Sequence, residues 1–155
     1  MLACPDATER FGQALAPHLR GGDTIALSGE LGAGKSLLAR AIIATRLEAL
    51  GRPEEVPSPS FTLFQTYDLG VCEVWHADLY RLSGPGEVIE LGLEYAFDTA
   101  ICLVEWPEKL GSFLPERRLE ARLATVPEDE AVRWITLEAS GDGWEWLSEL
   151  DQGAP

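Results

Sequence analysis

Apolar residues recur at helical spacing near the start of the chain and then in short continuous runs. Pro5 opens the first predicted helix, with Asp6 as its N-cap. The residues on its inward face lie close to one another on the helix surface: Phe11, Leu15, His18 and Leu19. Pro17 is expected to kink or shorten this helix, because proline lacks a backbone donor and crowds the preceding turn. The apolar run 24–28 that follows is typical of a buried strand.

The remaining pattern predicts one α/β domain over residues 1–155. Residues 35–50 are rich in helix formers and end before Gly51, which favours a second helix. The run 101–104 is continuously apolar, as expected for a buried central strand. The other predicted elements are two hairpins and two short helices: 61–68 with 71–77 around Gly70, 118–126 with 131–139, 87–97, and 144–150. We therefore expect a mixed, mostly parallel central sheet flanked by helices, with antiparallel hairpins.

The composition is that of an ordinary globular protein, with 46% hydrophobic and 25% charged residues. No apolar run approaches the roughly 18 residues needed to cross a bilayer, and residues 1–10 lack a basic leader. We therefore expect a cytoplasmic protein without membrane association. Its three cysteines form no CxxC pair, and Cys72 and Cys102 are expected to be buried small hydrophobes.

Acidic residues outnumber basic ones by 26 to 12, which gives a formal net charge of −14. Such a surface repels phosphodiester backbones, so direct high-affinity binding of nucleic acid is not expected. The chain has two lysines, Lys35 and Lys109. The first lies in a glycine-rich loop.

This loop, from Gly29 to Ser36, satisfies the pattern G-x-x-x-x-G-K-[ST] between a predicted strand and a predicted helix. Its glycines allow a tight turn whose amides point at phosphate oxygens, and the helix adds the positive end of its dipole. Lys35 is expected to reach the β- and γ-phosphates and the Ser36 hydroxyl to ligate Mg²⁺. The pattern predicts a P-loop NTPase fold that binds a nucleoside triphosphate and Mg²⁺, and the lack of the GTPase motif Asn-Lys-x-Asp favours ATP. The predicted contacts are Glu30, Leu31, Gly32, Ala33, Gly34, Lys35, Ser36 and Leu37.

Two acids follow predicted strands and are candidates to manage the metal and an attacking water. Asp78 follows the run 74–77, and Glu105 follows the run 101–104. Residues just past the carboxyl ends of parallel strands gather at the ligand crevice. Taken alone, Asp78 could equally be a turn or N-cap residue, and Glu105 an acid at a helix start. His76 alone is more often a structural histidine, and Trp106 is a candidate to line the pocket.

Together these motifs resemble the TsaE (YjeE) family of P-loop ATPases of bacterial tRNA threonylcarbamoyladenosine synthesis. The resemblance covers roughly residues 8–107. It rests on GELGAGKS at 29–36, SPSFTL at 58–63, HADLYRL at 76–82 and EWP at 105–107. The phosphate loop is common to many enzymes, and the three later motifs at these spacings make the match specific.

The resemblance implies a role for each matched residue. The catalytic residues would be Lys35, Asp78 and Glu105, and the metal would be held by Ser36, Asp78 and Glu105. Glu105 would lie at or near the metal, and Asp78 would be a metal-shell or water-orienting acid.

Further roles follow from the same resemblance. Ser60 and Thr62 would belong to a switch-like loop that senses the γ-phosphate. Trp106 and Thr8 would lie close to the nucleotide. The family usually has Thr at positions 36 and 60 and often Asp at position 30; the serines here keep the hydroxyl, so metal ligation survives.

The resemblance also implies a function: an ATPase, weak alone, that acts with TsaB-like and TsaD-like proteins and resets their assembly between turnovers. A small-molecule kinase and a non-hydrolysing nucleotide switch remain alternatives. A kinase usually needs an arginine-rich lid, whereas Arg117-Arg118 is the one adjacent arginine pair in the sequence. The match fades after Pro107, so the C-terminal hairpin receives no functional residues from it.

Overall fold

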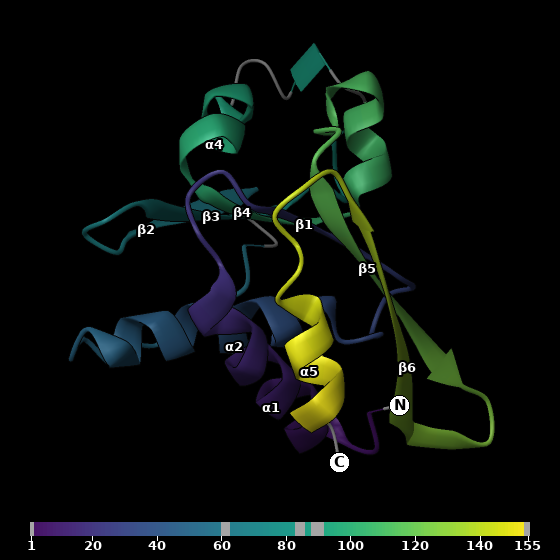
Figure 1. The fold of residues 1–155 in the computed structure, drawn as a ribbon. Helices are drawn as coiled ribbons and strands as arrows, with labels where there is room; N and C mark the ends of the chain where they lie inside the picture. Colours follow the sequence, from purple (N-terminus) through teal and green to yellow (C-terminus); the bar gives the residue numbers. More distant parts are fainter. Residues whose placement is uncertain (1, 60–62, 83–85, 88–91, 154–155) are drawn as a thin grey trace.

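The structure, a computed structural model, describes residues 2–59, 63–82, 86–87 and 92–153. Within them, six strands form one sheet in the order β2-β3-β4-β1-β5-β6 (Figure 1). The strands are β1 (Thr24–Ser28), β2 (Phe64–Asp68), β3 (Glu73–Asp78), β4 (Ile101–Glu105), β5 (Arg118–Val126) and β6 (Asp129–Ser140). β3, β4, β1 and β5 are parallel, whereas β2 and β6 pair antiparallel at the two edges. The predicted mixed, mostly parallel sheet with two antiparallel hairpins is confirmed.

Helices cover both faces of the sheet (Figure 1). One face carries α1 (Pro5–Leu15), α2 (Lys35–Ala49) and α5 (Leu147–Gly153), and the other carries α4 (Leu93–Thr99) and the 3₁₀ helix Pro107–Phe113. A 3₁₀ turn, Ala16–His18, follows α1, as Pro17 leads us to expect. No helix in the described residues is long and apolar enough to cross a membrane.

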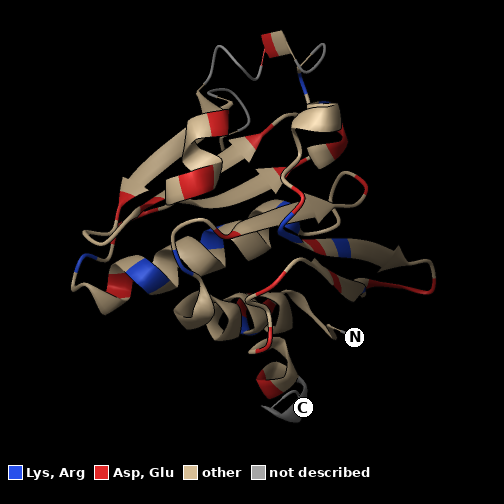
Figure 2. Cartoon of the chain, turned by 45° about the horizontal axis from the view of Figure 1, so that its top comes forward, with Lys and Arg blue, Asp and Glu red and all other residues tan. Residues whose placement is uncertain are grey.

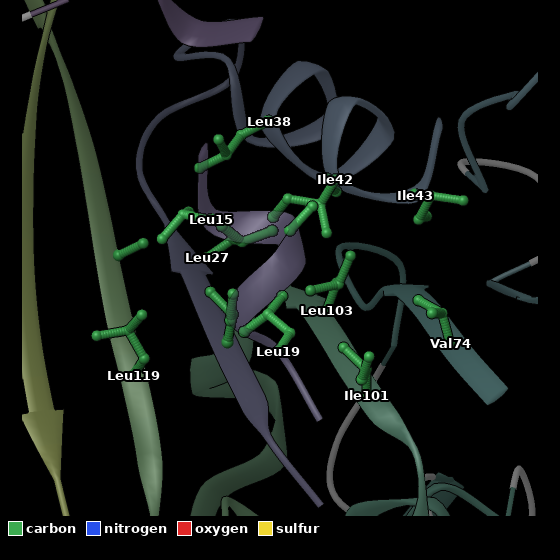
Figure 3. Packing of buried hydrophobic residues seen from close by; sticks show 14 of the residues in the cluster. Leu15, Leu19, Leu27, Leu38, Ile42, Ile43, Val74, Ile101, Leu103 and Leu119 are labelled. Atoms are coloured by element: carbon green, nitrogen blue, oxygen red, sulfur yellow. The ribbon is translucent and has the colours of Figure 1, made fainter. Parts of the chain in front are cut away.

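Alternation along β4 divides the core into two apolar clusters, one on each face. Ile101 and Leu103 pack toward α1 and α2 (Figure 3), whereas Cys102 and Val104 belong to the cluster under α4. All four side chains are fully buried. Successive residues of a strand point to opposite faces of the sheet. Whether a position is odd or even along its strand therefore decides which helices its side chain faces, also at the strand end.

Some predicted boundaries are wrong, for local reasons. Cys4 rather than Asp6 is the N-cap of α1, because Pro5 takes the first helical position and leaves Asp6 in the first turn. The helix expected over 87–97 is seen in part: residues 86–87 are helical, residues 88–91 lie outside the described residues, and α4 follows Gly92, which has a left-handed φ of 77°. The terminal helix begins at Leu147 rather than Trp144.

The cysteines differ in exposure, which gives a first test of the fold. Cys102 is buried as predicted, and burial raises the pKa of its thiol to about 12. The prediction for Cys72 is wrong, because it is only partly buried beside the β2–β3 turn. We expect native alkylation with iodoacetamide to label Cys4 and Cys72 and to spare Cys102, since the thiolate is the nucleophile. Mass spectrometry of tryptic peptides checks this, with the urea-unfolded chain as the control in which all three react.

Candidate functional site

The loop between β1 and α2 presents backbone amides at a helix N-terminus. Gly34 is the N-cap of α2, with a left-handed φ of 106°, and no side chain in the described part of the chain caps it. The first amides of α2 therefore lack intrahelical acceptors at the positive end of the helix dipole. Gly29 is required for packing, since a Cβ there would lie 2.4 Å from the carbonyl oxygen of Leu123. Loop and helix together form a site suited to an anion.

Lys35 lies folded across its own loop. Its Nζ donates to the carbonyl oxygens of Gly29 at 2.6 Å and Glu30 at 2.8 Å, and lies 4.1 Å from the centroid of a Trp106 ring. Burial lowers the pKa of Lys35, and the nearby carboxylates, Glu105 foremost, oppose this shift. These contacts hold the positive charge of Lys35 at the loop.

Ser36 and His76 both bind the carboxylate of Glu105. Ser36 Oγ lies 2.9 Å from each carboxylate oxygen, and His76 Nε2 lies 2.7 Å from Oε2. Glu105 is 3% exposed and His76 is fully buried. Nδ1 of His76 has no hydrogen-bond partner among the described residues, so Glu105 is the contact that its ring makes there. The histidine that sequence reasoning left as structural thus orients Glu105.

Alternation along the strands explains why the two predicted acids converge. Asp78 and Glu105 are the last residues of β3 and β4 and are partners in the parallel register. Glu105 points to the same face of the sheet as Leu103, and Asp78 to the same face as Val74. Leu103 and Val74 both belong to the cluster under α1 and α2. Both acids therefore face α2, whose N-terminus lies at this carboxyl edge of the sheet.

Asp78 is the more exposed of the two acids. Its Oδ1 accepts a hydrogen bond from the Tyr80 amide at 3.1 Å. Burial raises the pKa of Asp78, the Tyr80 amide opposes this, and the negative charge of Glu105 adds to it. A carboxyl group with a raised pKa at a cavity wall is a candidate for proton transfer.

Trp106 closes one side of the site in a strained conformation. Its φ of 60° and ψ of 52° are left-handed, which is uncommon for a residue with a side chain. In this conformation the indole lies against the Lys35 ammonium and beside Tyr80, whose ring centroid is 4.9 Å away. Such outliers cluster at functional sites.

The phosphate loop, the start of α2, Asp78, Glu105 and Trp106 line one cavity of about 410 Å³, a size typical of small-molecule sites. With the exception of Glu30, every predicted site residue in the described part of the chain lines it: Thr8, Leu31, Gly32, Ala33, Gly34, Lys35, Ser36, Leu37, Asp78, Glu105 and Trp106. Glu30 lines the neighbouring groove and reaches the site through its carbonyl oxygen. Ser60 and Thr62 lie outside the described residues, so the switch-like loop stays a prediction.

Sequence reasoning missed a contribution from the C-terminal hairpin. Ala131 and Arg133 line the same cavity, and the Arg133 guanidinium donates to the carbonyl oxygens of Gly32 and Ala33, both at 3.1 Å. Alternation along the predicted strand could have indicated the face on which Arg133 lies. Arg133 is on the same face as Ile135 and Leu137, which pack against the cluster under α1 and α2.

The donor set at the cavity fits a hard divalent cation. Ser36, Asp78 and Glu105 offer hydroxyl and carboxylate oxygens, which Mg²⁺ prefers. Within the described residues, no group of three or more His, Cys, Asp or Glu side chains could hold a metal ion. Magnesium is commonly bound by one or two carboxylates together with substrate phosphates, and these residues match that mode.

Comparison with known proteins gives a consistent result. A family model described as "Threonylcarbamoyl adenosine biosynthesis protein TsaE" matches residues 2–133. A tRNA threonylcarbamoyladenosine biosynthesis protein TsaE from Rickettsia bellii is 36% identical over 138 residues, covering 89% of this chain and 94% of the relative. Its counterpart from Bacillus subtilis is 36% identical over 146 residues, covering 94% and 87%. The crystal structure of B. subtilis YdiB superposes with a TM-score of 0.73 at 32% identity, covering 97% of this chain and 91% of that one.

Proposed function

Because this chain belongs to the TsaE family of threonylcarbamoyl adenosine biosynthesis proteins, we propose that it acts in tRNA modification by binding ATP with Mg²⁺ and hydrolysing ATP to ADP and phosphate. The proposed role is that of a cytoplasmic accessory ATPase. Its cycle resets an assembly of TsaB-like and TsaD-like proteins between turnovers.

One observation carries the proposal. The uncapped N-terminus of α2, the Lys35 ammonium and the Glu105 carboxylate meet in one cavity. A polyphosphate site needs backbone N–H donors and a positively charged side chain. A magnesium ion bound to the phosphates also needs oxygen ligands from the protein. The loop, the start of α2 and the end of β4 place these groups around one cavity, which supports the proposal.

Each group at the site has a separate role in the proposed reaction. The loop amides and Lys35 bind the phosphate groups and balance their charge. Ser36, Asp78 and Glu105 would hold Mg²⁺, which neutralises charge on the β- and γ-phosphates when bound. His76 keeps the Glu105 carboxylate facing Ser36, and Asp78, at the cavity wall beside Glu105, would stand in the metal shell or orient a water molecule.

The overall charge supports a protein partner rather than RNA as the direct contact. The net charge is −14, and Lys and Arg residues are few and scattered among the acids (Figure 2). A protein that bound tRNA by itself would need Lys and Arg to neutralise phosphates. We expect no direct high-affinity binding of nucleic acid.

Phosphate release tests the proposal. We expect slow release from ATP by the isolated protein, less from GTP, and a rise when the TsaB–TsaD pair is added. A rate that partners leave unchanged would count against the role in the assembly. A phosphorylated metabolite in place of inorganic phosphate would instead identify a kinase, and nucleotide binding without any release would identify a switch.

A further inference from the structure

Arg133 lies where three distant parts of the chain meet: the phosphate loop, the C-terminal hairpin and the N-terminus. It pairs with Thr125 across the hairpin. On its other side, its backbone exchanges hydrogen bonds of 2.7 and 2.8 Å with Leu2, beside which the chain begins (Figure 1). Because the backbone of Arg133 is paired on both sides, its side chain starts from a fixed position.

The guanidinium binds main-chain carbonyl oxygens on both the loop and the hairpin. Nε donates to Ala33 and Nη2 to Gly32, each at 3.1 Å, while Nη1 donates to Glu130 and Val132. The planar fork of arginine suits such simultaneous contacts, because its donors are held in fixed directions. The side chain therefore ties the phosphate loop to the turn of the hairpin.

Holding these carbonyl oxygens also orients amides. In a trans peptide unit the C=O and N–H bonds point in opposite directions. The carbonyl of Ala33 shares its peptide unit with the N–H of Gly34, a residue that lines the cavity in the left-handed region. Glycine leaves the backbone unusually free. The hydrogen bond from Arg133 to the Ala33 carbonyl oxygen therefore restricts the directions in which the Gly34 amide can point.

Arg133 also adds positive charge at the loop. No carboxylate in the described part of the chain forms an ion pair with it, although the net charge is −14. Arginine stays protonated at all physiological pH values. Its charge therefore adds to that of Lys35 at an anion site.

We propose that Arg133 is a positioning residue of the nucleotide site: it fixes the phosphate loop from the C-terminal hairpin and so sets the affinity for the phosphate groups. This inference rests on the proposed nucleotide binding and extends the site to a segment outside the motifs of the loop and the strand ends.

Calorimetry with Mg-ADP and with a non-hydrolysable Mg-ATP analogue tests the effect on affinity. Arg133→Ala is expected to weaken both by about tenfold and by the same factor, because charge-assisted bonds that hold the amides are lost and both nucleotides use those amides. Arg133→Lys should stay within about threefold of the alanine variant, since an ammonium lacks the planar fork. Arg52→Ala is the matched control: Arg52 also donates to a main-chain carbonyl, that of Asp68 at 2.7 Å, and should leave both affinities unchanged.

A second measurement needs no nucleotide. In spectra of ¹⁵N-glycine-labelled protein, Arg133→Ala is expected to shift the amide signals of Gly32 and Gly34, and Arg52→Ala to leave them in place. If the wild type binds neither nucleotide, the proposed function fails, and these signals alone decide whether Arg133 positions the loop.

Several results would overturn the inference. They are an unchanged affinity in Arg133→Ala, full recovery in Arg133→Lys, unshifted glycine signals, or a fall in the urea unfolding midpoint that accounts for the lost affinity. The last result would assign Arg133 to general stability.

Discussion

Replacing Glu105 by glutamine is expected to lower ATP turnover at saturating nucleotide by about 100-fold or more, the scale of lost catalytic electrostatics. Glutamine has the shape of glutamate and keeps hydrogen-bonding capacity toward Ser36 and His76, so the fold should survive. What is lost is the negative charge at the end of β4, which lies against the Ser36 hydroxyl in a nearly buried position. Initial rates of phosphate release measure the effect.

Glu108→Gln is the matched control for this substitution. Glu108 is exposed, lies three residues further along, and its charge also acts on Lys35. Its removal therefore tests whether any nearby negative charge suffices, and turnover should stay within about twofold, since exposed charges are strongly screened. Retention of half or more of the wild-type rate in Glu105→Gln would contradict the catalytic role.

Leu103→Ala is expected to lower the free energy of unfolding by about 2–5 kcal/mol, because it opens a cavity that a packed core cannot refill. Leu103 is fully buried in β4, with His76 and Ile25 as its register partners on the two neighbouring strands. It lies within the cluster under α1 and α2 (Figure 3). Such a loss is a large share of the stability of a domain of this size.

Urea denaturation followed by far-UV circular dichroism measures this loss. Val71→Ala is the control, since Val71 is 86% exposed, and surface changes usually stay within about 0.5 kcal/mol. Equal unfolding free energies for the two variants would show that β4 does not lie at the centre of the core. Saturating Mg-ADP should raise the unfolding midpoint of Leu103→Ala, because a ligand that binds only the folded state stabilises it.

The elements with strong local signals could be predicted from sequence. The loop before α2 is specified by residue types at fixed spacing, and the run 101–104 has no polar position that could face water. The convergence of Asp78 and Glu105 could also be predicted, because the carboxyl ends of parallel strands gather at one edge of a sheet. The N-cap of α1 was misplaced by two residues, because the helical pattern alone does not show that Pro5 takes the first helical position.

The missing parts of the candidate site depend on contacts between distant segments. His76 is bound to Glu105 because both occupy the same face of adjacent strands, a relation that appears only once the register is known. Arg133 lies a hundred residues after the loop carbonyl that it binds, and it is held there by pairing with Leu2. Alternation along β6 predicts the face on which Arg133 lies, but no local pattern in the sequence predicts either contact.

The central claim is that the loop before α2 binds a magnesium nucleotide. Isothermal titration calorimetry of the wild type with Mg-ADP and with a non-hydrolysable Mg-ATP analogue tests it most directly, with Ser36→Ala and a magnesium-free titration beside it. We expect binding of one nucleotide per chain, weakened by Ser36→Ala when magnesium is present and much less when it is absent. The absence of heat with either magnesium nucleotide, or identical affinities in Ser36→Ala under all conditions, would contradict the account.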